Sequence, residues 1–148
     1  MMSRHVEDIG SLSWSRDPET QKNAAMNLLA ADDWDCENCI IGTEKDVWEN
    51  LVAVIEKTGR GTKKTLCRDL LFLLQDLNWP GALRAREIVR GMSKDDVLRP
   101  LQEALLQAYA SNDGIWISNL KSLVDYFGYG GESFQDMNLA AILEKAEW

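Results

Sequence analysis

Apolar residues recur every three or four positions over most of the chain, the spacing that predicts amphipathic helices. The first segment with this spacing covers residues 18–31. It follows Asp17, a residue type that caps helices, and it starts with a proline, which suits the first helical position. The second segment runs from about residue 44 to residue 58, with Thr43 or Asp46 as its possible cap. The N-terminal part of the chain is therefore predicted to form two helices.

The middle of the chain holds the densest run of apolar residues. A third helix is predicted to begin at Thr62, with leucines too closely spaced for a helix on the surface, so it should form the buried centre of the fold. These leucines are Leu66, Leu70, Leu71, Leu73, Leu74 and Leu77. Residues 78–81, Asn-Trp-Pro-Gly, form a predicted break, because a proline disfavours helical backbone at the preceding residue. A short helix over residues 82–90 follows and ends at Gly91.

Three further helices are predicted after this short one. Ser93 and Asp96 have the spacing of a capping box, which would open a helix reaching about residue 110. Pro100 lies in its early turns, so this helix is expected to begin late or to bend. A helix over residues 114–127 comes next, and an amphipathic helix over residues 133–147 ends the chain.

About seven helices joined by short turns, with no convincing strand, predict an all-α fold. Each helix pair has an apolar face that it cannot bury alone, which is typical of stacked helical repeats. We therefore expect stacked antiparallel helix pairs in a HEAT- or armadillo-like α-α superhelix. Residues 1–148 are predicted to form one such domain, with residues 1–11 flexible.

The formal net charge of the 148 residues is −8, and it is unevenly distributed. Residues 1–58 carry 12 acidic and 5 basic side chains, residues 59–100 carry 5 and 9, and residues 101–148 carry 7 and 2. Free nucleic acid is a poor partner for such a chain, because phosphates attract clustered Lys and Arg. A basic protein fits better, since opposite potentials accelerate association.

The sequence contains no apolar run approaching the ~20 residues that cross a bilayer, and no leader-like apolar segment at its start. No membrane partner is expected, and the predicted compartment is the cytoplasm. The odd number of cysteines, which are Cys36, Cys39 and Cys67, argues against a secreted disulfide framework.

Residues typical of catalytic or metal sites are few. The only histidine is His5, so a His-based triad lacks its parts. Cys36 and Cys39 have the spacing of half a zinc site or of a redox pair, but no second such pair accompanies them, and two small side chains near a helix start are the favoured interpretation. Residues 59–64 resemble a phosphate-binding loop only superficially, so a loop between helices, capped by Thr62, is favoured. We predict no catalytic residue, no metal site and no cofactor, hence a binding protein and not an enzyme.

An aromatic residue among acids is the clearest candidate for partner binding. The chain has six tryptophans, a residue type enriched at interface hot spots. Trp34 lies in an acidic connector with no helical periodicity, whose acids are Asp32, Asp33, Asp35 and Glu37. Such a group can contact Lys or Arg of a basic partner through ion pairs and cation–π interactions. The alternative is that Trp34 folds back and fixes the connector to the core.

Residues 74–82, Leu-Gln-Asp-Leu-Asn-Trp-Pro-Gly-Ala, resemble the signature of a bacterial family of small HEAT-like helical domains of unknown function. Leu73 stands where that signature often has a tryptophan. Residues 12–21, which start Leu-Ser-Trp-Ser-Arg-Asp-Pro-Glu, also match, as does a later group that comprises Asp113, Trp116, Asn119 and Leu120. The resemblance covers roughly residues 12 to 125.

Within the signature, each distinctive residue also has a structural interpretation, which we favour. Trp79 would fill the gap between helices, and Pro80 with Gly81 would fix the turn. Asp76 or Asn78 would bind exposed backbone groups.

Members of this family resemble immunity proteins, cytosolic partners that neutralise a toxin of the same or a neighbouring cell. The resemblance implies an acidic helical protein that occludes a basic toxin domain, for which a nuclease is the expected kind. Two alternatives stay open. One is a general helical-repeat adaptor that binds a cytosolic protein along its concave face. The other is an enzyme with a site assembled from scattered acids.

Overall fold

The computed structural model describes residues 5–31, 34, 39–134 and 137–147. Within these residues the chain forms nine α-helices and two short 3₁₀ helices. The α-helices are α1 (His5–Gly10), α2 (Pro18–Ala30), α3 (Lys45–Lys57), α4 (Arg60–Thr65), α5 (Cys67–Phe72), α6 (Ala82–Arg90), α7 (Lys94–Ala110), α8 (Gly114–Phe127) and α9 (Leu139–Leu143). The 3₁₀ helices are η1 (Leu73–Gln75) and η2 (Gly131–Ser133). The described part of the chain contains no strand, and the prediction of an all-α fold is confirmed.

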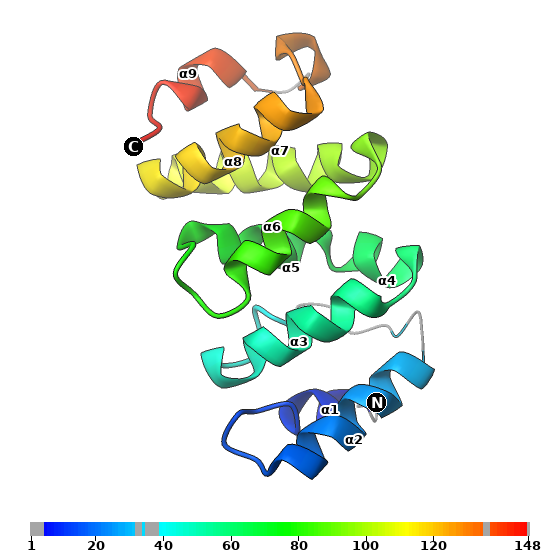
Figure 1. Cartoon of the computed structure of the whole chain (residues 1–148). Helices are drawn as coiled ribbons and strands as arrows, with labels where there is room; N and C mark the ends of the chain where they lie inside the picture. The colour runs from blue at the N-terminus through cyan, green and yellow to red at the C-terminus, as the bar shows by residue number, and fades with distance from the viewer. Residues whose placement is uncertain (1–4, 32–33, 35–38, 135–136, 148) are drawn as a thin grey trace.

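The helices are stacked in layers, from α1 and α2 at one end to α9 at the other (Figure 1). Contacts follow the order of the chain: α1 packs on α2, α2 on α3, α3 on α6, α5 on α6 and α7, α7 on α8, and α8 on α9. One cluster of buried apolar side chains runs through all layers, from Ile9 to Ile142. No helix in the described ranges has the length and the apolar character needed to cross a membrane.

Several predicted elements are present with the expected ends. Asp17 caps α2, and its carboxylate accepts a hydrogen bond from the backbone N–H of Thr20 at 2.8 Å. That hydrogen bond is the main reason why the pKa of Asp17 is lowered. Asp113 caps α8 in the same way, with the N–H of Trp116 as its donor at 3.0 Å. These caps satisfy donors that the first helical turn leaves unpaired.

The predicted central helix is buried as expected, but it is not one continuous helix. Five of its six leucines are fully buried, and Leu77 is partly buried. The chain nevertheless bends at Leu66, where ψ is 8°, and α4, α5 and η1 replace the single helix. Thr62 is not a cap but a buried residue inside α4, so the predicted loop over residues 59–64 is mostly helical.

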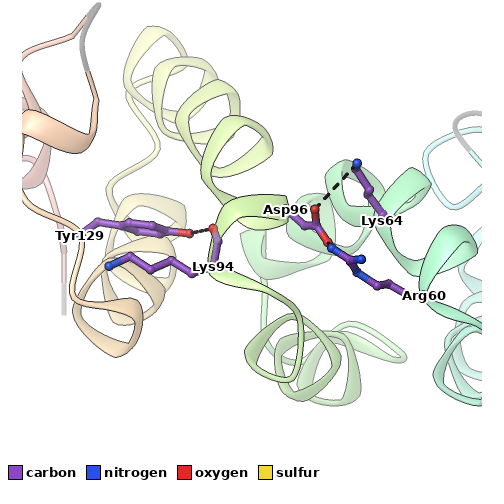
Figure 2. Close-up of polar contacts among 5 residues, drawn as sticks. All are labelled: Arg60, Lys64, Lys94, Asp96 and Tyr129. Carbon is purple, nitrogen blue, oxygen red and sulfur yellow. Dashed lines mark hydrogen bonds and ion pairs between the residues drawn. The ribbon is translucent and has the colours of Figure 1, made fainter.

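The predicted caps of α3 and α7 also differ, and Asp46 lies inside the first turn of α3. Glu44 precedes α3, and the Thr43 hydroxyl instead donates to the carbonyl of Cys39 at 2.8 Å. Ser93 precedes α7 without a side-chain capping bond. Asp96, the expected partner of Ser93 in a capping box, pairs with Arg60 at 2.7 Å and with Lys64 at 3.8 Å (Figure 2). Asp96 thus has tertiary partners that local spacing does not reveal.

The two ends of the chain depart from the prediction in opposite ways. Residues 1–11 were expected to be flexible, yet α1 forms over His5–Gly10, and Ile9 is buried. At the other end, one long helix was expected over residues 133–147. Asn138 instead caps the five-residue α9 by accepting a hydrogen bond from Ala141 N–H, so the helix begins six residues later than predicted. The preceding segment, which starts at Gly128, is held by Tyr129, whose hydroxyl donates to the Lys94 carbonyl (Figure 2).

Candidate functional site

Of the predicted partner-binding residues, the structure describes only Trp34. Asp32, Asp33, Asp35 and Glu37 lie outside the described residues, as does Cys36. Trp34 is 2% exposed and belongs to the core, which is the alternative interpretation of this residue. Its buried indole Nε1 has no hydrogen-bond acceptor within the described part of the chain. An indole buried in this way offers no surface to a partner, so the role of Trp34 as an exposed anchor is corrected.

The signature turn over residues 74–82 is held by its own side chains. The carboxylate of Asp76 accepts a hydrogen bond from the backbone N–H of Asn78 at 2.8 Å. Trp79 packs against Trp48, with ring centroids 5.4 Å apart, and against Phe72 at 5.8 Å. Gly81 has φ +83°, a left-handed conformation that other residues rarely adopt. The structural interpretation of this motif is confirmed.

Helix α8 braces the signature turn with two of the residues that carry the family resemblance. The indole N–H of Trp116 donates to the carbonyl of Leu71 at 3.1 Å. The amide of Asn119 donates to the carbonyl of Leu74 at 2.6 Å. The group around Trp116 and the signature turn, although far apart in the sequence, therefore contact each other.

The turn between α1 and α2 is braced by the same device. The amide of Asn50, on α3, donates to the carbonyl of Leu12 at 2.7 Å and to Oε1 of Gln21 at 2.8 Å. The backbone N–H of Trp14 donates to the carbonyl of Asp46 at 3.0 Å, which ties the same turn to the start of α3. In both places a helical asparagine binds the carbonyl of a leucine at the start of a turn.

Replacement of either bracing asparagine by alanine should lower the free energy of unfolding by about 1 kcal/mol, the usual value of one lost hydrogen bond. Urea unfolding of Asn50→Ala and Asn119→Ala, followed by circular dichroism, measures this. Asn23→Ala on α2 is the matched control, because Asn23 is an exposed helical residue and gains the same helix propensity. Equal stability of Asn119→Ala and Asn23→Ala would contradict a bracing role.

All the segments that carry the resemblance lie along one edge of the stack, on the left of Figure 1. We define the motif edge as residues 11–17, 39–48, 72–83 and 106–119. Nine large apolar side chains are exposed among the described residues, and six of them belong to this edge. These six are Trp14, Ile41, Leu83, Leu106, Tyr109 and Ile115, and the other three are Val6, Met26 and Tyr126. The motif edge thus carries most of the large apolar side chains that are exposed among the described residues.

Two pockets open on the motif edge. The larger, of about 430 Å³, lies beside the signature turn and is lined by Trp79, Leu83 and Glu49, among others. The smaller, of about 180 Å³, lies between Ile41 and Trp116, with Phe72 in its wall. Phe72 lines the smaller pocket and Trp79 lines the larger one. Because the two rings pack against each other, one group of aromatic side chains contributes to both pockets.

The position of Ile41 is set by a buried carboxylate on α5. Asp69 is 2% exposed, and its Oδ2 accepts hydrogen bonds from the backbone N–H groups of Ile40 at 2.8 Å and Ile41 at 3.3 Å. Burial raises the pKa of Asp69, and the two hydrogen bonds oppose this shift. Asp69 was not among the candidate residues predicted from the sequence. Its signal was a lone acid between buried positions of a leucine-rich segment.

The opposite edge of the stack carries the basic residues of α4 (Figures 1 and 2). Arg60 and Lys64 pair there with Asp96. Nearby Cys67 is fully buried, and burial raises the pKa of its thiol to about 12, so the thiol is protonated near neutral pH. No cluster of three or more His, Cys, Asp or Glu residues able to hold a metal ion occurs in the described part of the chain.

No protein-family model matches this chain, and the curated proteins and the solved structures gave no match either.

Proposed function

We propose that this protein binds another protein through the motif edge and acts as an immunity protein, which neutralises a basic bacterial toxin by direct occlusion. A nuclease is the proposed kind of toxin, and the cytoplasm is the proposed compartment. In this proposal the layers are HEAT-like helical repeats, and the turns at one edge of the stack form the binding surface.

The observation that carries the proposal is the concentration of exposed apolar side chains on the motif edge. Six of the nine exposed large apolar side chains among the described residues lie there. Contiguous exposed apolar surface on a globular protein is typical of interaction sites. Trp14 and Tyr109 are among the six, 59% and 45% exposed, and aromatic residues are enriched at such sites. Trp14 and Ile41 lie in segments that hydrogen bonds fix, and the other four side chains lie in helices, so little conformational entropy is lost on association.

The charge of the chain favours a basic partner. The net charge is −8, and the exposed carboxylates of Glu49 and Glu103 line the two pockets of the motif edge, each beside one arginine, Arg84 or Arg68. Acidic groups around an apolar centre select a positively charged partner and accelerate encounter, and salt weakens both effects. A general adaptor that binds an apolar peptide would show weaker salt dependence.

Disruption of the motif edge should abolish binding of the partner. The double variant Ile41→Ser with Ile115→Ser removes two exposed apolar side chains from this edge, and Val6→Ser with Met26→Ser removes two from elsewhere. Each tagged protein is used to capture partners from a lysate of its native cell over a salt series, with mass spectrometry as the readout. We expect the wild type and the Val6/Met26 variant to recover one basic toxin domain at low salt and to lose it at high salt. The Ile41/Ile115 variant should recover none.

Three outcomes would contradict the proposal. Equal capture by both double variants would show that the motif edge is not the binding surface. Recovery of unrelated proteins without salt dependence would favour the adaptor. Recovery of no toxin domain by the wild type would contradict the proposed immunity function.

A further inference from the structure

The smaller pocket of the motif edge is assembled from segments that are far apart in the sequence. Ile41 precedes α3, Phe72 ends α5, Ala104 lies on α7 and Trp116 lies in the first turn of α8. The pocket has a volume of about 180 Å³. At roughly 30 Å³ for a water molecule in the liquid, this corresponds to about six waters, enough room for one apolar side chain.

Each wall of this pocket is fixed by a separate contact. Asp69 holds the backbone N–H of Ile41, and the indole N–H of Trp116 donates to the Leu71 carbonyl. Phe72 meets the edge of the Trp48 ring, with ring centroids 6.1 Å apart and planes at 90°. A pocket with fixed walls loses little conformational freedom when a side chain enters it, so the entering group contributes more to affinity.

The rim of the pocket carries a carboxylate that is available to a partner. Glu103 is exposed and adjacent to Ala104 in the wall, and it forms no ion pair with any residue that the structure describes. Arg68 and Gln107 also line the pocket, and Glu103 is the acid among its lining residues that can pair with a basic neighbour of an entering apolar side chain. A basic surface that contacts this acidic chain would supply that neighbour.

We infer that this pocket receives a single apolar side chain of the partner, and that a basic residue next to that side chain pairs with Glu103. The inference rests on the proposed function, because it identifies the anchor within the same motif edge. Anchors of this kind, buried in a well-formed pocket and surrounded by polar contacts, contribute most of the affinity in many interfaces.

The test uses the whole protein and three capped tripeptides as probes: acetyl-Lys-Leu-Lys-amide, acetyl-Lys-Ser-Lys-amide and acetyl-Glu-Leu-Glu-amide. Titrations are followed by ¹⁵N–¹H NMR, with the indole N–H signal of Trp116 assigned through Trp116→Phe. We expect the Lys-Leu-Lys peptide to shift the Trp116 indole and Ile41 amide signals and to bind about tenfold more tightly than the serine peptide. The acidic peptide should bind more weakly than Lys-Leu-Lys, and the difference should shrink at high salt.

Variants of the protein separate the pocket from the rim. Ala104→Met should fill the pocket and abolish the difference between the leucine and serine peptides. If Ala104→Met does not fold, Ile41→Ser opens the wall at an exposed position and should reduce the same difference. Glu103→Gln should weaken Lys-Leu-Lys binding about threefold, a typical loss for an exposed ion pair. Glu132→Gln, an exposed acid on η2, is the matched control and should leave binding unchanged.

Absence of a shift at Trp116, or equal binding of the leucine and serine peptides, would overturn the inference. Equal effects of Glu103→Gln and Glu132→Gln would overturn the role of Glu103. The peptide titration does not require the natural partner, so its result is independent of the capture experiment. If the wild type captured a toxin through the motif edge but did not bind the leucine peptide, the proposed function would stand and the inferred anchor pocket would be wrong.

Discussion

Replacement of Gly81 by alanine should lower the free energy of unfolding by about 3 kcal/mol, because backbone strain and overpacking add at this position. Gly81 has φ +83°, which strains any residue with a Cβ atom. A Cβ atom at this position would lie 2.9 Å from Cγ2 of Val52 and 3.1 Å from the backbone carbonyl oxygen of Trp48. The carbonyl belongs to α3 and cannot move without disturbing the contact between α3 and the signature turn. Urea unfolding followed by circular dichroism measures the change.

Gly128 offers the matched control for Gly81. Its φ is +71°, so an alanine there meets the same backbone strain, but no heavy atom lies within 4 Å of the added Cβ. Gly128→Ala should therefore cost only about 1 kcal/mol, the strain alone. If the two variants lost equal stability, the close approach of α3 to the turn would make no contribution to the free energy of unfolding.

Removal of the Asp69 carboxylate should also destabilise the protein strongly. In Asp69→Ala the N–H groups of Ile40 and Ile41 lose their acceptor, and Ile40 is fully buried. A buried donor without a partner costs about 1–3 kcal/mol, so we expect a loss of about 2 kcal/mol in the free energy of unfolding. The loss should be accompanied by a shift of the Ile41 amide signal in NMR spectra. Unchanged stability would show that the segment before α3 is held by its apolar contacts alone.

Asp69→Asn tests the same site through its pH dependence. The pKa of Asp69 is raised above its ordinary value of 3.8 in the folded state, chiefly by burial, so the folded protein binds this proton more tightly than the unfolded chain. The contribution of Asp69 to stability is therefore greatest below pH 3.8 and falls as the pH rises through the folded-state pKa. Asparagine does not titrate. The stability of the wild type minus that of Asp69→Asn should decrease from pH 3 to pH 7, and an increase would contradict the raised pKa.

Helix positions and core residues followed from the sequence because they depend on periodicity. The short helix predicted over residues 82–90 is present as α6, and its apolar spacing places Ala82, Ala85, Ile88 and Val89 in the core. The cap at Asp17 was also correct, because it is a local contact. Local spacing fails to predict capping where a tertiary partner competes for the side chain. Asp96 is the clearest case, since Arg60, 36 residues earlier in the sequence, binds its carboxylate.

The candidate site was less accessible to sequence reasoning. The family resemblance drew attention to the signature turn and to Asn119, but Asn50, the equivalent brace of the first turn, carried no such signal. The edge formed by four separate segments depends on how the layers stack, which periodicity does not define. For Trp34 the sequence instead suggested a functional role that its position does not support. Its acidic neighbours suggested exposure, whereas the indole is a core side chain.

The two asparagine braces also bear on the order in which the molecule folds. Most packing contacts join elements that are neighbours or near neighbours along the chain, so the layers can form in fast, local steps. The braces instead join residues 38 and 45 positions apart, Asn50 with Leu12 and Asn119 with Leu74. The entropy of closing those loops must be overcome before the turns are fixed. We therefore expect the motif edge to be completed late in folding, so that a partly folded chain, including one still emerging from the ribosome, lacks the surface proposed to bind the partner.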